Sequence, residues 1–390
     1  MLRLSLSVVI YFVKMIKINK IVVFLEGDAS KLSTWSNVPY FFIETLKRKG
    51  FNVDIFDIST WNVIKKLYNH SISKIIDIFF PKHACQFERT LLYNFLVERK
   101  LKKYIISDKN SDLYIIMNYT FYNKWNLVPT ITFSDWSYDY FIKDRCQRQP
   151  YFFEKRYLAK QKKALENVQM AISLFEGCAN YMKNQVTRAN IQFLGGNVIN
   201  MMQKPSKGVD EIICQKQKKI KILFIGMKKY ITGAQLLVDT FLKLKNIFYD
   251  AELHIVGLTN KTLNNLTCGV TCHGYLHKDV LEECNEYYAL LEQATIFVNP
   301  TEQWAGYSSM VEAMYFYTPI IVSPYKEFVE EFGTNIDFGK YNTRFSVDSL
   351  LDSLLDILQS DFYSDMCKNA HCKVENFTWD NYVQRLLDKL

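Results

Sequence analysis

Glycines, lysines and an acid stand where apolar runs end in the second half of the sequence. The first such junction runs from Gly226 to Gly233, contains Lys228 and Lys229, and opens a predicted helix. Glycines let the backbone approach a ligand closely, and lysines and the N–H groups of a helix start attract phosphate. Glycine-bounded loops with lysines are also common on plain surfaces, so a phosphate site and an ordinary loop both remain open here.

Two further junctions follow apolar runs that we expect to be strands. They contain the residues His273, Gly274, Tyr275 and Glu302. Because ligands of open parallel sheets bind beyond the carboxyl ends of the strands, these residues are expected to converge with Lys228 on one site.

The fourth junction is a glycine turn before a helix. The turn is Gly306, Tyr307 and Ser308. Ser308 or Ser309 can cap the helix, and its first N–H groups can hold an anion. The same helix carries Glu312, which would repel phosphate but can accept hydrogen bonds from vicinal hydroxyls such as those of a ribose. The alternative is an acid that only complements the helix dipole, an effect of about 0.5 kcal/mol.

Several classes of site are disfavoured by what the sequence lacks. Neither the P-loop pattern nor G-x-G-x-x-G occurs, which argues against an NTPase or an NAD enzyme. The nine cysteines are an odd number at spacings that suggest no disulfide framework, so they indicate a reduced, cytosolic chain. Cys268 and Cys272 adjoin His273, but no second ligand pair with zinc-like spacing follows, and we expect no metal site.

The elements that must position these junctions are short apolar runs alternating with amphipathic stretches. The runs are 20–26, 53–58, 113–118, 130–135, 170–175 and 191–196 in the first half, and 220–226, 252–257, 270–274, 295–300 and 319–323 in the second. Strands joined by helices imply parallel sheets covered on both faces. We therefore predict an α/β protein of two Rossmann-like, doubly wound parallel-sheet domains facing a cleft.

The division into domains follows from length and from one polar segment. A chain of 390 residues exceeds what one hydrophobic core usually organises. Residues 203–219 are poor in apolar side chains and rich in lysine, which predicts a linker between a first domain at 15–202 and a second at 220–375. Residues 1–14 are interpreted as a poorly ordered or misassigned extension, because Met15 would be an ordinary start before the first strand.

The net charge of +8 is concentrated in one segment. Residues 143–163 hold eight lysines or arginines against two acids, with aromatic residues between them. Such a segment can lie on an anionic membrane surface, or it can be a solvated helix face over an ordinary core, and both interpretations stay open. Nucleic acid is a weaker candidate partner, because no finger, RNP or basic-zipper pattern accompanies the charge.

Residues 220–332 resemble the donor-binding lobe of family 4 glycosyltransferases, which are retaining enzymes of the GT-B fold. The resemblance rests on ILFIG followed by Gly233, on AELHIVG, HGYL and NP-T, and above all on EAM followed by TPIIVS. Weaker similarity extends over the first half. The stretch FTWDNYVQRLL resembles the family's last helix, here expected at 376–390 and expected to pack back on the first domain.

The resemblance implies roles for individual residues. Glu312 matches the second acid of an E-x7-E motif, which binds the ribose of the nucleotide, and the backbone of the Gly306 turn would approach the diphosphate and sugar. Gly27 resembles a loop residue of the first domain that closes over the donor. The other residues expected in the donor site are Lys228, Lys229, His273, Gly274, Tyr275, Tyr307 and Ser308.

Two carboxylates are the expected catalytic groups. Asp135 occupies the region where the family places a residue on the acceptor side, and it is expected to orient the acceptor, with Trp136 as a sugar platform. The alternative there is an Asp turn and a packed Trp. Glu302 lies near the first acid of the E-x7-E motif, although it is off register.

The sequence also departs from the family pattern. Trp304 stands where the first acid is expected, and Met227 and Thr232 replace the usual basic pair, so that Lys228 or Lys229 would have to reach the diphosphate. These changes leave a divergent subfamily, an unusual donor and a loss of catalysis as three open explanations.

The function expected from the sequence is transfer of a sugar, with retention, from a nucleotide donor to a hydroxyl of a growing glycan. A lipid-linked saccharide at the inner membrane surface is the expected acceptor, in the assembly of capsule, O-antigen or a similar envelope polysaccharide. No metal or other cofactor is expected, because a helix start and lysines can neutralise the leaving diphosphate. The alternative is a protein that keeps the GT-B fold and binds a glycan or partner without turnover.

Overall fold

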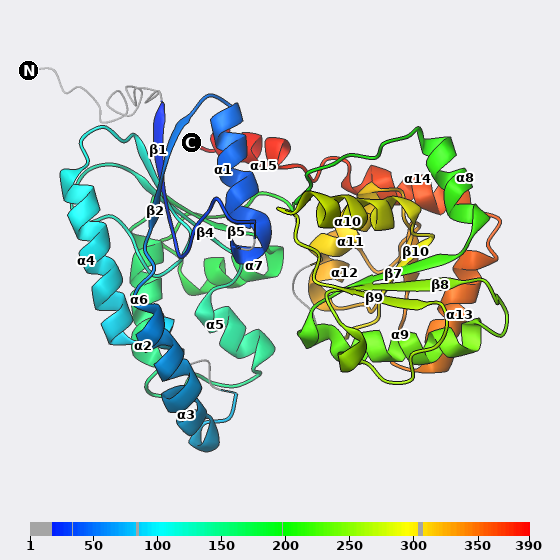
Figure 1. The fold of residues 1–390 in the computed structure, drawn as a ribbon. Coiled ribbons are helices and arrows are strands. Elements are labelled where there is room, and N and C mark those ends of the chain that lie inside the picture. The colour runs from blue at the N-terminus through cyan, green and yellow to red at the C-terminus, as the bar shows by residue number, and fades with distance from the viewer. Residues whose placement is uncertain (1–17, 33, 83–85, 197, 303–306) are drawn as a thin grey trace, which may run out of the picture. The chain divides into compact units, whose positions relative to one another are not determined.

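The computed structural model describes residues 18–390 except 33, 83–85, 197 and 303–306. By its internal contacts the chain divides into two compact units, with unit 1 ending at Leu194 and unit 2 beginning at Gly195. Each unit holds a six-stranded sheet whose strands pair in parallel, with helices on its faces (Figure 1). The predicted class, two Rossmann-like α/β domains with doubly wound parallel sheets, is confirmed.

Unit 1 has the strand order β2-β1-β3-β4-β5-β6. Its strands are β1 (Lys20–Leu25), β2 (Asn52–Asp57), β3 (Leu113–Ile116), β4 (Thr130–Ser134), β5 (Met170–Ser173) and β6 (Ile191–Phe193). Its helices are α1 (Val38–Arg48), α2 (Asn62–Leu67), α3 (Ser73–Phe79), α4 (Leu91–Ser107), α5 (Tyr138–Tyr140), α6 (Lys155–Glu166) and α7 (Glu176–Gln185). Each strand overlaps one of the predicted apolar runs, because strands covered on both faces must be apolar throughout.

The two faces of this sheet are covered by different helices. On one face Phe24 and Tyr114 pack in a core with residues of α4, among them Val97. On the opposite face Phe42 of α1 stacks on Phe133 of β4 with ring centroids 5.4 Å apart. Side chains of a strand point alternately to the two faces, so the long apolar runs supply both cores at once.

Unit 2 has the strand order β12-β11-β10-β7-β8-β9. Its strands are β7 (Lys221–Ile225), β8 (Glu252–Val256), β9 (Val270–Gly274), β10 (Ile296–Asn299), β11 (Ile320–Val322) and β12 (Gly339–Tyr341). Its helices are α8 (Val209–Lys218), α9 (Ile231–Leu244), α10 (Leu281–Gln293), α11 (Ser308–Tyr315), α12 (Lys326–Phe332), α13 (Val347–Leu358), α14 (Tyr363–Val374) and α15 (Trp379–Leu387). In Figure 1 the strands β7 and β8 lie between α9 and α10.

One predicted segment folds differently from the expectation. Residues 209–218, the second half of the expected linker, form α8, in which Ile212 and Ile213 are buried in unit 2. Two adjacent apolar residues suffice to dock a ten-residue helix and leave the segment polar on average, and the linker itself stays a prediction. The other predicted domain limits, and the return of the last helix to the first domain, stay predictions.

A lysine inside α8 holds three parts of unit 2 together. Lys216 is fully buried, and its Nζ donates hydrogen bonds to Leu291 O at 3.2 Å, Ala294 O at 2.8 Å and Thr318 Oγ1 at 2.8 Å. The first two acceptors belong to the end of α10, where backbone carbonyls lack helical partners. Burial lowers the pKa of Lys216 to about 7, since the charged form loses its hydration.

We expect Lys216→Met to lower the free energy of unfolding by about 1–3 kcal/mol, because it leaves buried acceptors without a donor. Lys218→Met, at an exposed site of the same helix, should change it by no more than about 0.5 kcal/mol. Because the unfolded chain binds more protons between the folded pKa of about 7 and the ordinary 10.5, the wild type should gain stability as pH rises through this window. Urea unfolding of the three proteins at pH 7 and pH 10 measures both effects, and an equal pH dependence in Lys216→Met would contradict this account.

Candidate functional site

The predicted junctions of unit 2 lie at one edge of its sheet. The strands β7 to β11 are parallel, so the residues that follow them, among them Gly226, Gly274 and Thr301, leave the sheet at the same side. Two close approaches of backbone mark this edge. A Cβ at Gly257, whose φ is +96°, would lie 2.5 Å from Gly226 O, and a Cβ at Gly233 would collide with Thr301.

The lysine junction, which is the segment between β7 and α9 with Lys228 and Lys229, leads into the helix α9. Lys228 and Lys229 form a 3-10 turn that leads into α9, and both side chains are exposed. Although the Lys229 side chain is exposed, neighbouring protein atoms partly desolvate its ammonium group and lower its pKa. Among the described residues no side chain caps α9, and the Ile231 N–H at its start donates to Lys228 O within the 3-10 turn. Lys228 and Lys229 stand directly before the start of the helix, the end that favours negative charge. The arrangement can bind an anion such as a diphosphate.

The junction at the end of β9 holds one side chain that is turned away from the edge of the sheet, His273, and two residues that lie at the edge, Gly274 and Tyr275. The ring of His273 lies under α10, where Nδ1 is 2.5 Å from Glu286 Oε1 and Nε2 is 3.1 Å from His254 Nδ1. Its side chain therefore points to a face of the sheet, away from the edge. Gly274, with φ +70°, ends β9, and the next residue, Tyr275, is 48% exposed. Only Gly274 and Tyr275 lie where a ligand could reach them.

The start of α11 differs from the prediction. Tyr307 stands at the N-cap and Ser308 is the first helical residue, and no side chain within the described ranges caps the helix. The expected serine cap is wrong, because the helix begins one residue earlier than a capping Ser308 would require. Tyr307 is buried against Phe328 and Phe332 of α12, so its side chain is not available to a donor.

The remaining residues of this junction are less constrained. Glu302 is exposed at the end of the described part of the loop. Gly306 and Trp304 lie outside the described residues. The predicted roles of Glu302 and Gly306 therefore stay predictions.

Glu312 is the centre of a buried polar cluster. It is 3% exposed, and its carboxylate accepts hydrogen bonds from Lys278 Nζ at 3.0 and 3.1 Å and from Tyr287 OH at 2.6 Å. Lys278 also donates to Asn200 O at 2.9 Å. Three of the roughly four lone-pair directions of a carboxylate are thus occupied by the protein itself. The cluster ties α11 to α10 and to the loop after β9, a role that sequence spacing did not show.

We expect Glu312→Ala to lower the free energy of unfolding by about 3–5 kcal/mol, because it leaves the Lys278 ammonium buried without a counter-charge. Glu302→Ala, at an exposed site, should stay within about 0.5 kcal/mol of the wild type. Chemical denaturation measures both. If Glu312→Ala is as stable as the wild type and loses affinity for a nucleotide sugar, then the carboxylate is held for a ligand and the structural account is wrong.

The carboxyl edge of the unit 1 sheet carries the acceptor candidates. Gly27, with φ +96°, donates its N–H to Asp57 Oδ1 at 2.9 Å and Ser59 Oγ at 2.8 Å, which fixes its loop to the end of β2. The N–H of Gly27 is therefore already paired.

Asp135 follows β4 at this edge. Its carboxyl group is covered deeply enough that burial raises its pKa, although the Trp136 N–H at 2.8 Å and the Ser134 hydroxyl at 3.2 Å donate to it and oppose the shift. A raised pKa and a position at the end of a strand suit a group that handles a proton or orients a hydroxyl.

Trp136 is packed, as the structural alternative expected. Its ring contacts Tyr140, Phe141 and Phe175, and the Arg145 guanidinium lies 4.4 Å from the ring centroid. The ring faces are therefore largely occupied, which disfavours a sugar platform. Its Nε1 is buried and has no acceptor among the described residues.

A second carboxylate lies at this edge, and no sequence pattern singled it out. Glu26 directly follows β1 and accepts a hydrogen bond from Tyr93 OH. Burial raises the pKa of Glu26, and the Tyr93 hydrogen bond opposes the shift. The signal available in the sequence was its place between the end of an apolar run and Gly27.

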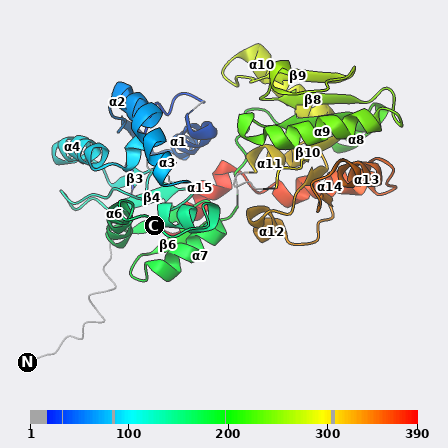
Figure 2. The same ribbon diagram turned by 90° about the horizontal axis from the view of Figure 1, so that it is seen from below.

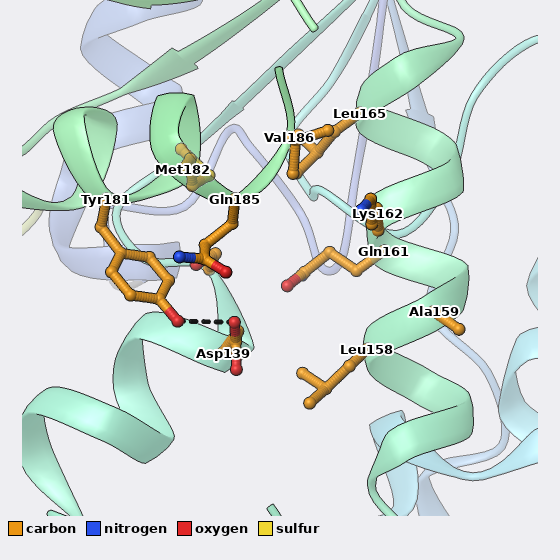
Figure 3. A pocket seen from close by; sticks show the side chains of 11 residues that line it. Asp139, Leu158, Ala159, Gln161, Lys162, Leu165, Tyr181, Met182, Gln185 and Val186 are labelled. Atoms are coloured by element: carbon orange, nitrogen blue, oxygen red, sulfur yellow. Dashed lines mark hydrogen bonds between the residues drawn. The ribbon is translucent and has the colours of Figure 1, made fainter. Parts of the chain in front are cut away.

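A small cavity opens between α5, α6 and α7 (Figure 3). It has a volume of about 190 Å³, and its lining combines apolar side chains with a pair in which Tyr181 OH donates to Asp139 Oδ2 at 2.6 Å. Pockets for small ligands usually have about 300–1,000 Å³. The cavity adjoins the loop after Asp135, but none of the described candidate residues lines it.

The basic segment 143–163 is partly neutralised by its own fold. Arg148 pairs with the buried Glu154 at 2.7 Å, Lys160 pairs with Glu98 at 2.9 Å, and Lys143 lies 5.2 Å from the centroid of the Tyr181 ring. Arg145 covers Trp136. Half of the segment's eight cations therefore have partners inside unit 1, which favours the solvated-face interpretation for them.

Within the described ranges, the chain shows neither a membrane-spanning helix nor a cluster of metal-binding side chains. No helix there is long and apolar enough to cross a bilayer. No group of three or more His, Cys, Asp or Glu residues there is placed to hold a metal ion.

We expect Asp135→Asn to be at least as stable as the wild type at pH 7, because an amide carries no buried charge. The raised pKa means that the folded chain holds the proton more tightly, so wild-type stability should fall as pH rises from the ordinary value of 3.8 through the raised one. The variant should lack this fall, and its sugar transfer should drop about 10²-fold if Asp135 orients the acceptor. Unfolding free energies from pH 3.5 to pH 7 and a transfer assay check these points, and an unchanged pH slope would contradict the first.

The comparisons with known proteins agree with this geometry. Residues 219–359 match the family model Glycosyl transferases group 1. No curated protein sequence matches the chain.

Solved structures resemble the chain over nearly its whole length. A sucrose-phosphate synthase from Thermosynechococcus elongatus is 15% identical with a TM-score of 0.65, and the match covers 95% of this chain and 98% of that chain. WaaG, a glycosyltransferase involved in lipopolysaccharide biosynthesis, is 15% identical with a TM-score of 0.60 and the same coverage. HepE from Anabaena, solved with UDP and glucose, is 11% identical with a TM-score of 0.57, again over 95% and 98%. At these identities the similarity shows the fold, which is GT-B.

Proposed function

We propose that the chain is a glycosyltransferase that moves a sugar from a nucleotide donor to a saccharide hydroxyl with retention. The match of residues 219–359 to the family model Glycosyl transferases group 1 and the GT-B fold support this proposal. The observation that carries the donor assignment is the lysine junction at the start of α9, within the matched residues 219–359. Retention and the nucleotide rest on the resemblance to family 4.

The donor would bind at the carboxyl edge of the unit 2 sheet. Lys228, Lys229 and the N–H groups at the start of α9 would stabilise the negative charge that develops on the leaving diphosphate. Gly274 and Tyr275 offer a close backbone and an exposed ring at the same edge. In this proposal Glu312 acts first as a support, since Lys278 and Tyr287 already hold its carboxylate, and one lone pair of Oε1 remains for a ribose hydroxyl.

The acceptor would bind at the carboxyl edge of the unit 1 sheet. Asp135 and Glu26 are carboxyl groups whose pKa values burial raises, and each follows a strand at this edge. Their role would be to accept hydrogen bonds from the attacking hydroxyl and to orient it. We further propose a lipid-linked acceptor at a membrane surface, as expected for envelope polysaccharide assembly, with the chain bound peripherally.

A second candidate function is binding of a glycan or partner without turnover. The observation that favours it is the occupied carboxylate of Glu312, together with Met227 in place of a basic residue. This candidate predicts no release of nucleotide from any sugar nucleotide, with or without an acceptor.

The first test is binding of UDP-, GDP-, ADP- and CMP-sugars by thermal shift. A donor at a hundred times its dissociation constant should stabilise the wild type by about 2.7 kcal/mol. Lys228→Ala should weaken binding of that donor about tenfold to hundredfold, because it removes a charge-assisted contact to the diphosphate. Lys218→Ala, on α8, should bind as the wild type does.

Catalysis is tested with the donor that binds. Released nucleotide in the presence of a saccharide acceptor, and the anomeric configuration of the product by NMR, are the measurements. An inverted product would overturn retention, and donor binding without any nucleotide release would favour the second candidate. Failure of every sugar nucleotide to bind would overturn the donor site.

A further inference from the structure

The helices α2 and α3 form a rod that projects from unit 1. A π-helical turn, Tyr68–Ile72, joins them into one nearly continuous helix. Figure 1 shows its outer end, α3, standing away from the strands, and Figure 2 views the rod from that end. Part of the surface of this rod is therefore not packed against the rest of unit 1.

The surface of this rod carries many exposed apolar side chains. Seven large apolar side chains in residues 61–79 are between 47% and 79% exposed: Trp61, Val63, Leu67, Ile72, Ile75, Ile78 and Phe79. These side chains recur along the rod between exposed polar residues such as Lys66, His70 and Asp77, and contiguous exposed apolar surface marks an interaction site. In unit 2, by contrast, exposed apolar residues such as Ile247, Leu281 and Phe362 lie on separate elements.

Only a narrow side of the rod is used for packing on unit 1. Ile64 and Tyr68 pack against the core under α4. At the far end, the Phe80 ring contacts Tyr151 and Phe153 with centroids 5.1 and 5.2 Å apart. The rod is thus anchored at both ends, which presents its apolar side in a fixed place.

The charges around this apolar surface are positive. Residues 61–82 contain four lysines against one aspartate, and Lys66, Lys74 and Lys82 are exposed. The Phe80 ring also contacts Phe152, which is 74% exposed and is followed by the exposed Lys155 and Arg156. We propose that this surface, the α2–α3 rod with Phe152, docks on an anionic lipid bilayer, with its apolar side chains in the acyl boundary and its cations at the headgroups.

A second copy of the chain fits this surface less well. Two copies meeting face to face would place the lysines of one rod opposite those of the other, and like charges across an interface oppose association. Anionic headgroups complement the same lysines. The charge therefore selects the lipid surface over a symmetric dimer.

The rod begins next to the edge of the sheet at which we propose that the acceptor binds. α2 begins a few residues after the carboxyl end of β2, and its Lys65 pairs with Glu88, beside the Glu26 carboxyl. The rod thus starts at the edge proposed for the acceptor, so docking would bring that edge to the headgroup level. This inference rests on the proposed transfer to a lipid-linked saccharide, and it moves the membrane contact from the basic segment 143–163 to the α2–α3 rod.

The test is sedimentation of the full chain with vesicles of phosphatidylcholine alone and of phosphatidylcholine with phosphatidylglycerol. We expect binding to the anionic vesicles that weakens at high salt. A triple variant, Leu67→Gln, Ile75→Gln and Ile78→Gln, should lose at least about tenfold in partitioning. The matched control, Ile247→Gln, Leu281→Gln and Phe362→Gln, changes three similarly exposed residues of unit 2 and should bind as the wild type does. Thermal unfolding checks that both variants are folded.

Three results would overturn the inference. The first is absence of vesicle binding by the wild type, and the second is equal vesicle binding by the wild type and the rod variant. The third is a dimer of the wild type in sedimentation velocity that is lost in the rod variant, while neither protein binds vesicles. That result would assign the surface to a second copy. Donor binding by thermal shift, measured without vesicles, should be the same in the wild type and the rod variant. It separates failure of this inference from failure of the proposed function, since only the latter abolishes the donor shift in the wild type.

Discussion

The parallel pairing of the strands is the constraint on which the rest of the molecule depends. Parallel strands must be joined by crossovers, so each strand in turn ends at the same edge of its sheet. In unit 2 this brings the loops after Gly226, Gly274 and Asn299 together, although more than seventy residues separate the first from the last. Local chemistry that looks scattered along the chain becomes one site, and side chains that point to a sheet face, such as His273, are left out of it.

Unit 2 buries an ionisable side chain near each edge of its sheet. Near the carboxyl edge, Glu312 is held by Lys278 and Tyr287. Near the amino ends of β10 and β11, Lys216 is held by three oxygens without an acidic partner among its hydrogen bonds. Lys216 lies where α10 ends and its backbone carbonyls lack helical partners, whereas Glu312 lies within α11 and is held by side chains. The ribose role expected for Glu312 must therefore coexist with a structural role, because a carboxylate that supports three elements cannot be freely reoriented.

Contacts within unit 1 decide which of its charged and apolar side chains remain exposed. The segment 143–163 is the most basic stretch of the chain, yet Arg145, Arg148 and Lys160 are drawn into intramolecular contacts. The α2–α3 rod is less conspicuous in sequence, and it carries seven large exposed apolar side chains, counting Trp61 at its start. Net charge along a sequence does not state which cations remain at the surface, because pairing depends on residues far away in the chain, such as Glu98.

The sequence by itself determined the fold class, eleven of the twelve strands in the described residues and the junctions that could carry chemistry, because strands covered on both faces require continuous apolar runs. It did not predict β12, which has three residues, or α8, whose two adjacent buried isoleucines are hidden in a polar segment. Only the tertiary structure decided that Trp136 is packed, that Glu26 joins Asp135 at one edge and that Glu312 already has partners. Each of these depends on side chains brought together from distant parts of the chain, and the periodicity of a sequence reports burial but not the identity of the neighbour.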